Sequence, residues 1–198
     1  LWVAPAVAKA AMDSKVAQIQ ITDFNAYRDT LEAYQGPEKV FIRSAIHKVH
    51  ANAANNKGVL PKIAFPEGSS SKVLKALCSI VEEKICEPIL LGSEYLIKEK
   101  IKKLDLQNLN DIQIINPYNS DKFDMYAQAL FERRQRKGVT SREAERLIGD
   151  TNYYASMMVE MGHADGLVSG SSMKYADAVR PVLQIIGVAK DAVPCGLN

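Results

Sequence analysis

From residue 60 onward, short and continuously apolar runs alternate with longer stretches whose apolar positions recur at helical spacing. Runs of this kind are typical of strands that are buried on both faces of a parallel sheet. Spacings of three and four residues predict amphipathic helices. Because the two types alternate and the connections are brief, the pattern predicts an α/β fold with a mostly parallel sheet and helices on both faces. The predicted strands lie in LPKIAFPEG (60–68), EPILLGS (87–93), IQIINP (112–117) and ADGLVSG (164–170).

The first 57 residues show helical spacing and no strand pattern. A helix is predicted over residues 1–13, with Pro5 in its first turn, where a missing N–H costs least. Asp23 is the predicted N-cap of a second helix, and a third is predicted over residues 38–56. This part of the chain is therefore predicted to be a helical linker, which gives way to the α/β part at about residue 58.

Composition excludes several classes of protein. The chain of 198 residues is 47% hydrophobic and 24% charged, which is ordinary for a globular protein. A net charge of +2 favours neither nucleic acid nor a membrane surface as partner, and no stretch approaches the roughly 18 apolar residues of a membrane helix. Three cysteines without metal-binding spacing are predicted to stay reduced, as in a cytoplasmic protein. His47 and His50 are predicted to be solvated, so no metal site is predicted.

Small polar residues follow the predicted strands. In parallel sheets ligands bind beyond the carboxyl ends of the strands, where helix N-termini accept phosphate or carboxylate groups. The same residue types also cap helices, and for any single loop capping is the more common explanation. Several such loops together favour a binding site only modestly. The loops are residues 66–69, Gly92-Ser93, Asn116-Pro117 and residues 169–172.

Arginines are the second candidate for anion binding. Residues 132–146 contain five arginines and several glutamates, which is typical of a solvated helix surface with ion pairs. No aromatic residues are interleaved, so binding of single-stranded nucleic acid is not predicted. Arg180 differs because it lies in an otherwise apolar helix, where its charge needs a partner. Local chemistry favours an ion pair with Asp177 over a bidentate grip on phosphate, although a guanidinium suits both.

Residues 149–170 predict a capped helix followed by a strand. Asp150 or Thr151 is the predicted N-cap, and Gly162 is the predicted end of the helix. His163, in the turn, is predicted to be structural, and no catalytic triad, GxGxxG or Walker sequence is present. A stripe of large side chains is predicted to fill the core rather than to bind a ligand: Tyr154, Met157, Met158 and Met161.

Several segments resemble known families. The run from Gly149 to Gly187 resembles the phosphate acetyltransferase and phosphate butyryltransferase family, as do FPEG at 65–68 and ERRQRKGVT at 132–140. The opening WVAPAVAKAAMDSKVA and the ITDFNAYRDTL that follows are similar to the C-terminal edge of the dinucleotide-binding domain of bacterial malic enzymes and its connector. The two resemblances occur in the order found in hybrid NADP-dependent malic enzymes, which carry a phosphate acetyltransferase-like domain at their C-terminus.

The resemblance implies a division of the chain. Residues 1–17 would be the tail of the upstream NAD(P)-binding domain, residues 18–57 a helical connector, and residues 58–198 the N-terminal half of a transferase-like domain. Its expected fold is like that of phosphotransacetylases and isocitrate dehydrogenases, and the chain is expected to be an excerpt cut at both ends. The family's catalytic serine, arginine and aspartate would lie beyond Asn198, so no catalytic residue is assigned.

The resemblance also implies a function. The parent enzyme would oxidatively decarboxylate malate to pyruvate with NADP and Mg²⁺ or Mn²⁺, all bound by upstream malic-enzyme domains. This segment is then expected to bind acetyl-CoA or a related acyl-CoA as an allosteric effector and to help form a homo-oligomer, without transferase activity. The alternatives are an active phosphate acetyltransferase and a domain that serves oligomerisation only.

Two features bear on the binding site that the resemblance implies. In transferases a small hydroxyl residue usually stands where this chain has Tyr175, which counts against transferase activity. Two arginines of the family's CoA cleft match positions in this chain, and for Arg180 this reverses the preference from local chemistry. The residues expected to bind the phosphates of the acyl-CoA are Arg134, Arg180, Ser169, Gly170, Ser171 and Ser172.

Overall fold

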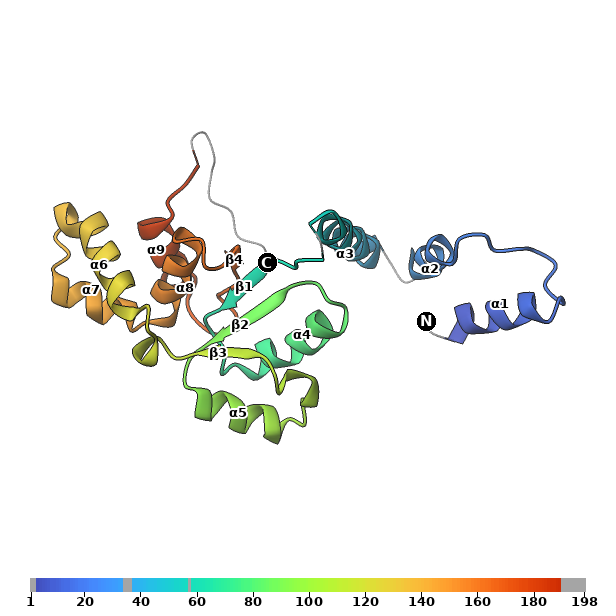
Figure 1. The fold of residues 1–198 in the computed structure, drawn as a ribbon, viewed down its shortest axis with the longest axis horizontal. Helices are drawn as coiled ribbons and strands as arrows, with labels where there is room; N and C mark the ends of the chain where they lie inside the picture. The colour runs from blue at the N-terminus through green and yellow to red at the C-terminus, as the bar shows by residue number, and fades with distance from the viewer. Residues whose placement is uncertain (1–2, 34–36, 57, 190–198) are drawn as a thin grey trace. The chain divides into compact units, whose positions relative to one another are not determined.

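The structure, a computed structural model, describes residues 3–33, 37–56 and 58–189, and the chain divides into two compact units, Leu1–Val59 and Leu60–Asn198. The first unit contains the helices α1 (Val3–Asp13), α2 (Phe24–Ala33) and α3 (Pro37–Asn55) (Figure 1). As predicted, Asp23 caps α2, because its Oδ1 accepts the backbone N–H groups of Asn25 at 2.8 Å and Ala26 at 3.1 Å. The assignment of this unit to malic-enzyme segments stays a prediction.

The second unit is built on four parallel strands, which confirms the predicted sheet. The strands are β1 (Lys62–Phe65), β2 (Glu87–Leu91), β3 (Gln113–Ile115) and β4 (Gly166–Leu167), in the spatial order β3-β2-β1-β4. From β1 the chain moves outward to β2 and β3, and β4 then pairs with the other side of β1. The direction of strand addition therefore reverses between β1 and β4, which creates a switch point at their carboxyl ends.

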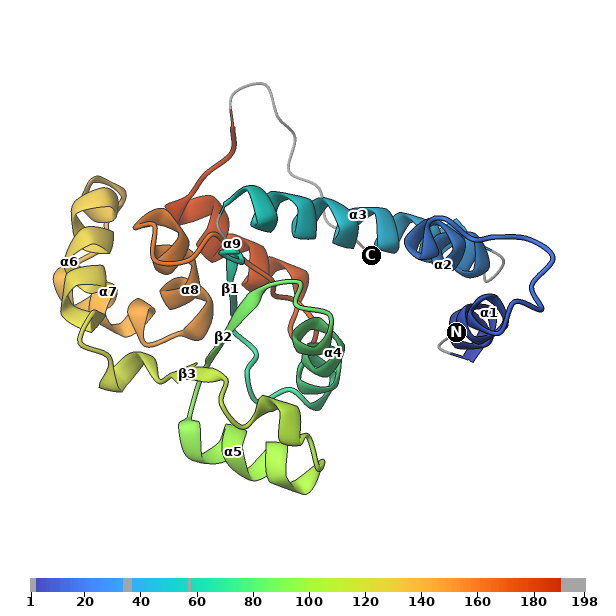
Figure 2. The same ribbon diagram turned by 45° about the vertical axis from the view of Figure 1, so that its right-hand side comes forward.

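Helices cover both faces of this sheet, as the alternation of patterns predicts. One face carries α4 (Ser71–Glu82) and α5 (Glu94–Lys103), and the other carries α6 (Phe123–Arg134), α7 (Ser141–Ile148) and α8 (Thr151–Glu160) (Figures 1 and 2). The last helix, α9 (Tyr175–Ile185), packs on α8. Short 3₁₀ turns are η1 (Gln107–Leu109), η2 (Pro117–Asn119) and η3 (Gln135–Lys137).

Each face has its own hydrophobic core, because successive side chains of a strand point to opposite faces. Leu90 of β2 packs with α4 and α5, whereas its neighbours Ile89 and Leu91 pack with α6, α7 and α8. Both clusters contain side chains that are completely buried, such as Leu74 on α4 and Leu130 on α6. Among the described helices, none has the length and hydropathy to cross a membrane.

Helix α8 matches its predicted boundaries but not the whole of its predicted buried stripe. Asp150 is the N-cap, because its carboxylate accepts the N–H groups of Asn152 at 2.9 Å and Tyr153 at 3.3 Å. Gly162 follows the helix with a φ of +71°, the left-handed conformation that favours glycine. Tyr154, Met157 and Met158 are buried as predicted. The prediction for Met161 is wrong, because this side chain follows the last helical residue and is 40% exposed.

Candidate anion-binding site

The loops that follow β1 and β4 meet at the switch point and are joined by one carboxylate. Glu67, in the turn after β1, is only 8% exposed. Its Oε2 accepts the backbone N–H groups of Gly170 at 2.9 Å and Ser171 at 2.8 Å. Its Oε1 accepts the backbone N–H of Ser172 at 2.5 Å and the hydroxyl of the same residue at 2.6 Å. Four donors from the second loop thus surround one carboxylate from the first.

Close packing holds the Glu67 turn in place. A Cβ on Gly68 would lie 2.6 Å from the carbonyl oxygen of Leu91, so only glycine fits between the turn and the end of β2. Lys100 Nζ on α5 donates to the carbonyl of Ser69 at 2.6 Å. On the other side, Gly170 has a φ of +104°, which directs the N–H groups of its loop toward the carboxylate. Both loops are therefore fixed by features outside their mutual contact.

Hydrogen bonding keeps Glu67 ionised. Burial raises the pKa of this carboxyl group, but the hydrogen bonds from the Ser172 side chain and from the three backbone N–H groups outweigh burial. The net result is a pKa below the ordinary value of 4.5. At neutral pH the switch point therefore holds a negative charge that belongs to the chain itself.

The sequence predicts that the loop at 169–172 binds a ligand's phosphates, and this stays a prediction. In the structure the N–H groups of Gly170, Ser171 and Ser172 donate to Glu67 instead. The Ser169 hydroxyl donates to Oδ1 of Asn152 at 2.6 Å, which ties the loop to the start of α8. The N–H groups of this loop are thus arranged to bind an anion, and the anion that they bind is the carboxylate of Glu67 from the same chain.

A second group of residues gathers around Tyr153, which lies on α8 and faces α9. Its hydroxyl donates to Oε1 of Gln184 at 2.7 Å. Burial and the negative charge of Asp150 raise the pKa of the Tyr153 phenol, and the positive charges of three arginines act in the opposite direction. These arginines are Arg180, Arg134 and Arg146, which come from three different helices. The structure therefore brings together the two arginines that the sequence singles out, Arg134 and Arg180.

Some arginines of this region already have carboxylate partners. Arg146 makes two hydrogen bonds to Glu143 on the same helix, at 2.8 and 2.7 Å. Arg133 at the end of α6 pairs with Glu160 on α8. The prediction of an ion-paired helix surface is therefore confirmed for these two arginines, whose charges serve the fold.

Arg134 and Arg180 are less well compensated. The Nε of Arg134 is buried and is among the described side-chain atoms that have no hydrogen-bond partner. Arg180 Nη2 lies 3.8 Å from Asp177 Oδ1, and both side chains are more than half exposed, so this ion pair is weak. The expectation that Arg180 sits in an apolar setting is wrong, because it points away from the buried face of α9, formed by Ala178, Pro181 and Ile185.

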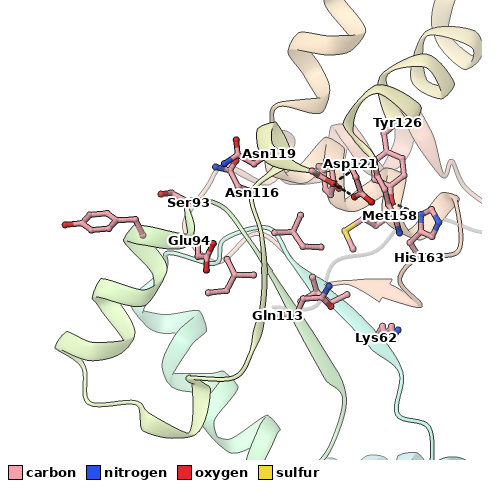
Figure 3. Close-up of a pocket in the computed structure, with 17 residues that line it drawn as sticks. Lys62, Ser93, Glu94, Gln113, Asn116, Asn119, Asp121, Tyr126, Met158 and His163 are labelled. Atoms are coloured by element: carbon pink, nitrogen blue, oxygen red, sulfur yellow. Dashed lines mark hydrogen bonds between the residues drawn. The ribbon is translucent and has the colours of Figure 1, made fainter.

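A cavity of about 850 Å³ lies elsewhere on the second unit (Figure 3). Ser93 and Asn116, from the predicted loops after β2 and β3, line it, but the residues expected to bind the acyl-CoA phosphates do not. Tyr126 and His163 point toward each other in it, with 2.6 Å between the phenol oxygen and Nδ1. Ser120 Oγ and the Tyr154 hydroxyl are 2.5 Å apart. Burial raises the pKa of Tyr126, so this phenol stays protonated at neutral pH. The structural role of His163 stays a prediction. The cavity is lined by Lys62 and Lys122 but by no arginine, so it lacks the planar guanidinium fork that binds a phosphate bidentately.

The sequence does not predict the roles of two residues of the site, although one of them, Glu67, lies in a predicted loop. Glu67 stands in the FPEG turn after β1, but its contact with residues more than 100 positions away has no local signal. Tyr153 is one of several aromatic residues in α8, and only the packing of α6, α7 and α9 brings arginines close enough to affect its pKa. Within the described ranges, no group of three or more His, Cys, Asp or Glu side chains is placed to hold a metal ion.

Comparison with known proteins places most of the second unit and the end of α3 in one family. The family model "Phosphate acetyl/butaryl transferase" matches residues 44–193. The chain belongs to this family. Its fold is similar to that of EutD phosphotransacetylase from Staphylococcus aureus, with a TM-score of 0.67 and 32% identity over 77% of this chain and 44% of that one.

Relatives of two kinds match the sequence. A phosphate acetyltransferase from Thermoanaerobacterium thermosaccharolyticum is 39% identical over 149 residues, which cover 75% of this chain and 44% of the relative. An NADP-dependent malic enzyme from Salmonella typhimurium is 31% identical over 188 residues, which cover 93% of this chain and 24% of the relative. The chain thus spans less than half the length of the transferase and about a quarter of that of the malic enzyme.

Proposed function

We propose that the second unit binds acetyl-CoA or a related acyl-CoA and acts as a regulatory and oligomerisation domain of an NADP-dependent malic enzyme, without transferase activity. Arg134 and Arg180 hold the phosphates of the ligand beside Tyr153. The loop of Ser169, Gly170, Ser171 and Ser172 forms the adjoining wall and contributes exposed side chains such as that of Ser171.

The unpartnered Nε of Arg134 is the observation that carries this proposal. The protein covers this Nε but offers it no acceptor, so the fold does not use the whole guanidinium, and its terminal nitrogens remain the groups that we expect to meet an anion. The planar guanidinium fork matches a phosphate bidentately, and Arg180 adds a second positive charge on the neighbouring helix. A ligand that binds one state of the attached enzyme better than another shifts the equilibrium toward that state.

The extent of the matches supports the malic-enzyme context. Malic enzymes of Salmonella typhimurium and Rhizobium meliloti match over 93% and 94% of the chain, so the similarity extends into the first, helical unit. Phosphate acetyltransferases match over 63 to 75% of the chain. A helical unit shared with malic enzymes is expected if the chain joins their catalytic domains to a transferase-like domain.

An active phosphate acetyltransferase is the second candidate, because the transferases have the higher identity. The enzyme from Bacillus subtilis is 41% identical over 125 residues, against 31 to 33% for the malic enzymes. CoA-dependent arsenolysis of acetyl phosphate by the protein that contains this chain separates the two functions. We expect no arsenolysis, together with malate-dependent reduction of NADP whose rate changes when acetyl-CoA is added. Arsenolysis at a rate that depends on CoA would contradict the regulatory function and support an active phosphate acetyltransferase.

The binding claim is tested by calorimetric titration with acetyl-CoA. We expect saturable binding to the wild-type protein and weaker binding to Arg180→Ala, because one of the two uncompensated charges is lost. The acetyl-CoA response of malate turnover is expected to weaken in the same variant. If acetyl-CoA gives no heat of binding and no change in Tm, the binding claim is wrong and oligomerisation remains as the role of this unit.

A further inference from the structure

The switch point of a parallel sheet is where an open α/β fold usually binds its ligand. Here the switch point lies between β1 and β4, and the loop after β4 offers three consecutive N–H groups there. Consecutive N–H groups of this kind normally form a cradle for phosphate. In this protein Glu67 fills the cradle with a carboxylate, although the sequence alone marks the same loop as a phosphate site.

The contact between Glu67 and this loop is complete. Both oxygens of the carboxylate are used, and each accepts two hydrogen bonds, all between 2.5 and 2.9 Å. The three N–H groups have their acceptor, so the loop needs no ligand to be ordered. A second anion that approached these N–H groups would meet the charge of Glu67 at short range, where like charges repel strongly.

We propose that Glu67 is a positioning residue that closes the switch-point cradle to external anions and fixes the Ser169–Ser172 loop beside the arginine site. The proposal rests on the proposed function in one respect, namely that the phosphates of an acyl-CoA are bound next to this loop. It narrows the proposed binding mode, because the phosphates are held by side chains, chiefly those of the two arginines, and not by the backbone N–H groups of the loop.

The location of Ser169 explains how Glu67 acts on the arginine site. Its hydroxyl bonds to Asn152, which is the neighbour of Tyr153 on α8. Gly170 lies against Ala178 of α9, where a Cβ on the glycine would be 3.8 Å from that of the alanine. The loop that Glu67 holds therefore touches both helices that carry Tyr153 and Arg180. Loss of the carboxylate removes the acceptor of residues 170–172, and we expect this part of the loop to become less ordered between the two helices.

Amide hydrogen exchange, measured by NMR, tests the role of Glu67 without any ligand. In the wild-type protein we expect the amides of residues 170, 171 and 172 to be protected. In Glu67→Gln, which keeps one acceptor oxygen but loses the charge, we expect them to exchange about tenfold faster or more. Glu99→Gln on the surface of α5 is the matched control and is expected to leave the three amides unchanged. Unchanged exchange in Glu67→Gln would overturn the proposal.

A ligand titration tests the closing of the cradle. When inorganic phosphate or acetyl-CoA is added to the wild-type protein, we expect shifts in the Nε–H signals of Arg134 and Arg180 and almost none in the three loop amides. In Glu67→Ala the cradle is empty, and we expect inorganic phosphate to shift the loop amides. Loop amides that respond in the wild-type protein as strongly as the arginine signals would contradict the proposal.

The two experiments separate failure of this proposal from failure of the proposed function. If acetyl-CoA does not bind the wild-type protein, the proposed function is wrong, while the exchange rates and the phosphate response of Glu67→Ala still decide the role of Glu67. If Glu67→Ala and Glu67→Gln do not fold, Ser172→Ala removes a single donor to Oε1 and is expected to speed exchange of amides 170 to 172 by about twofold or more. No change in Ser172→Ala would then count against the proposal.

Discussion

Two regions of the second unit are suited to bind an anion, and they differ in how their donors are satisfied. At the switch point, three backbone N–H groups and one hydroxyl are all bound to Glu67. Around Tyr153, Arg134 has a buried Nε without an acceptor, and Arg180 has only a distant and exposed partner. In the first region the chain itself supplies an acceptor for every one of these donors, whereas in the second region at least one donor has no acceptor.

This difference indicates which features of a chain are the better evidence for a binding site. Glycine and serine residues after a strand predict a loop with free N–H groups, but they do not show whether a side chain from elsewhere in the fold takes those groups. An arginine without a strong partner in the fold is the stronger indication of an anion-binding site. Leaving its donors unpaired costs free energy, and a bound anion removes that cost.

The largest effect on stability is expected for Gly68→Ala, which disturbs the Glu67 turn at the switch point. Its new Cβ would lie 2.6 Å from the backbone oxygen of Leu91, which has little freedom to move. We expect a loss of about 3 kcal/mol in the free energy of unfolding, as for strong overpacking, measured by urea denaturation. Gly149→Ala is the matched control, because its Cβ would meet only the end of the exposed Tyr118 side chain, and it is expected to cost less than about 1 kcal/mol. Equal losses in the two variants would contradict a rigid turn at Glu67.

A smaller effect, with a defined pH dependence, is expected for Glu67→Gln. At neutral pH we expect a loss of about 2 kcal/mol in the free energy of unfolding, because the hydrogen bonds to a charged acceptor are weakened. The pKa of Glu67 is lower in the folded than in the unfolded protein, so its stabilisation is present above the unfolded value and is lost as pH falls through the folded value. Urea denaturation should therefore show the gap between wild type and variant shrinking as the pH is lowered below 4.5. A gap that grows on acidification would mean that the carboxylate is not stabilised by the loop.

On the side of the arginines, Arg134→Lys tests geometry separately from charge. Lysine keeps the positive charge but loses the planar fork, so we expect acetyl-CoA to bind about three- to fivefold more weakly, as measured by calorimetry. Stability should be little changed, because the Nε of Arg134 has no partner to lose. An affinity equal to that of the wild type would show that this site attracts phosphate by charge alone.

The smallest effect is expected for Asp177→Asn. The atoms of its pair with Arg180 are 3.8 Å apart and both side chains are exposed, so the free energy of unfolding should change by less than about 0.5 kcal/mol. Acetyl-CoA should bind slightly more tightly, because a carboxylate that competes with the ligand is gone. A large loss of stability in thermal unfolding would indicate that the pair of Asp177 and Arg180 stabilises the fold, which would contradict a ligand-binding role of Arg180.

Much of the fold follows from the sequence, because the period of the apolar residues determines the elements. The four strands, their parallel arrangement and the cap of α8 by Asp150 are all predicted from local patterns. Met161 was assigned to the core on spacing alone, but the helix ends before it and its side chain is exposed. Local spacing cannot show where the last buried turn of a helix stops.

The site was less predictable, since it depends on contacts between distant segments. Family resemblance indicates Arg134, and local chemistry together with the resemblance indicates Arg180. That both arginines lie near Tyr153 follows only from the packing of α6, α8 and α9. The bond from Glu67 to the loop after β4 spans more than 100 residues, and nothing in the FPEG turn indicates its partner. A buried carboxylate opposite a loop of glycine and serine becomes visible only once β1 and β4 are known to be neighbours.

The central claim is that Arg134 binds the phosphates of an acyl-CoA, and a paired calorimetric titration with acetyl-CoA tests it most directly. Arg136, an exposed arginine two residues further along the same basic segment, provides the matched control. We predict that Arg134→Ala raises the Kd for acetyl-CoA about tenfold or more, while Arg136→Ala stays within about twofold of the wild type. Equal Kd values for Arg134→Ala and the wild-type protein would contradict the claim.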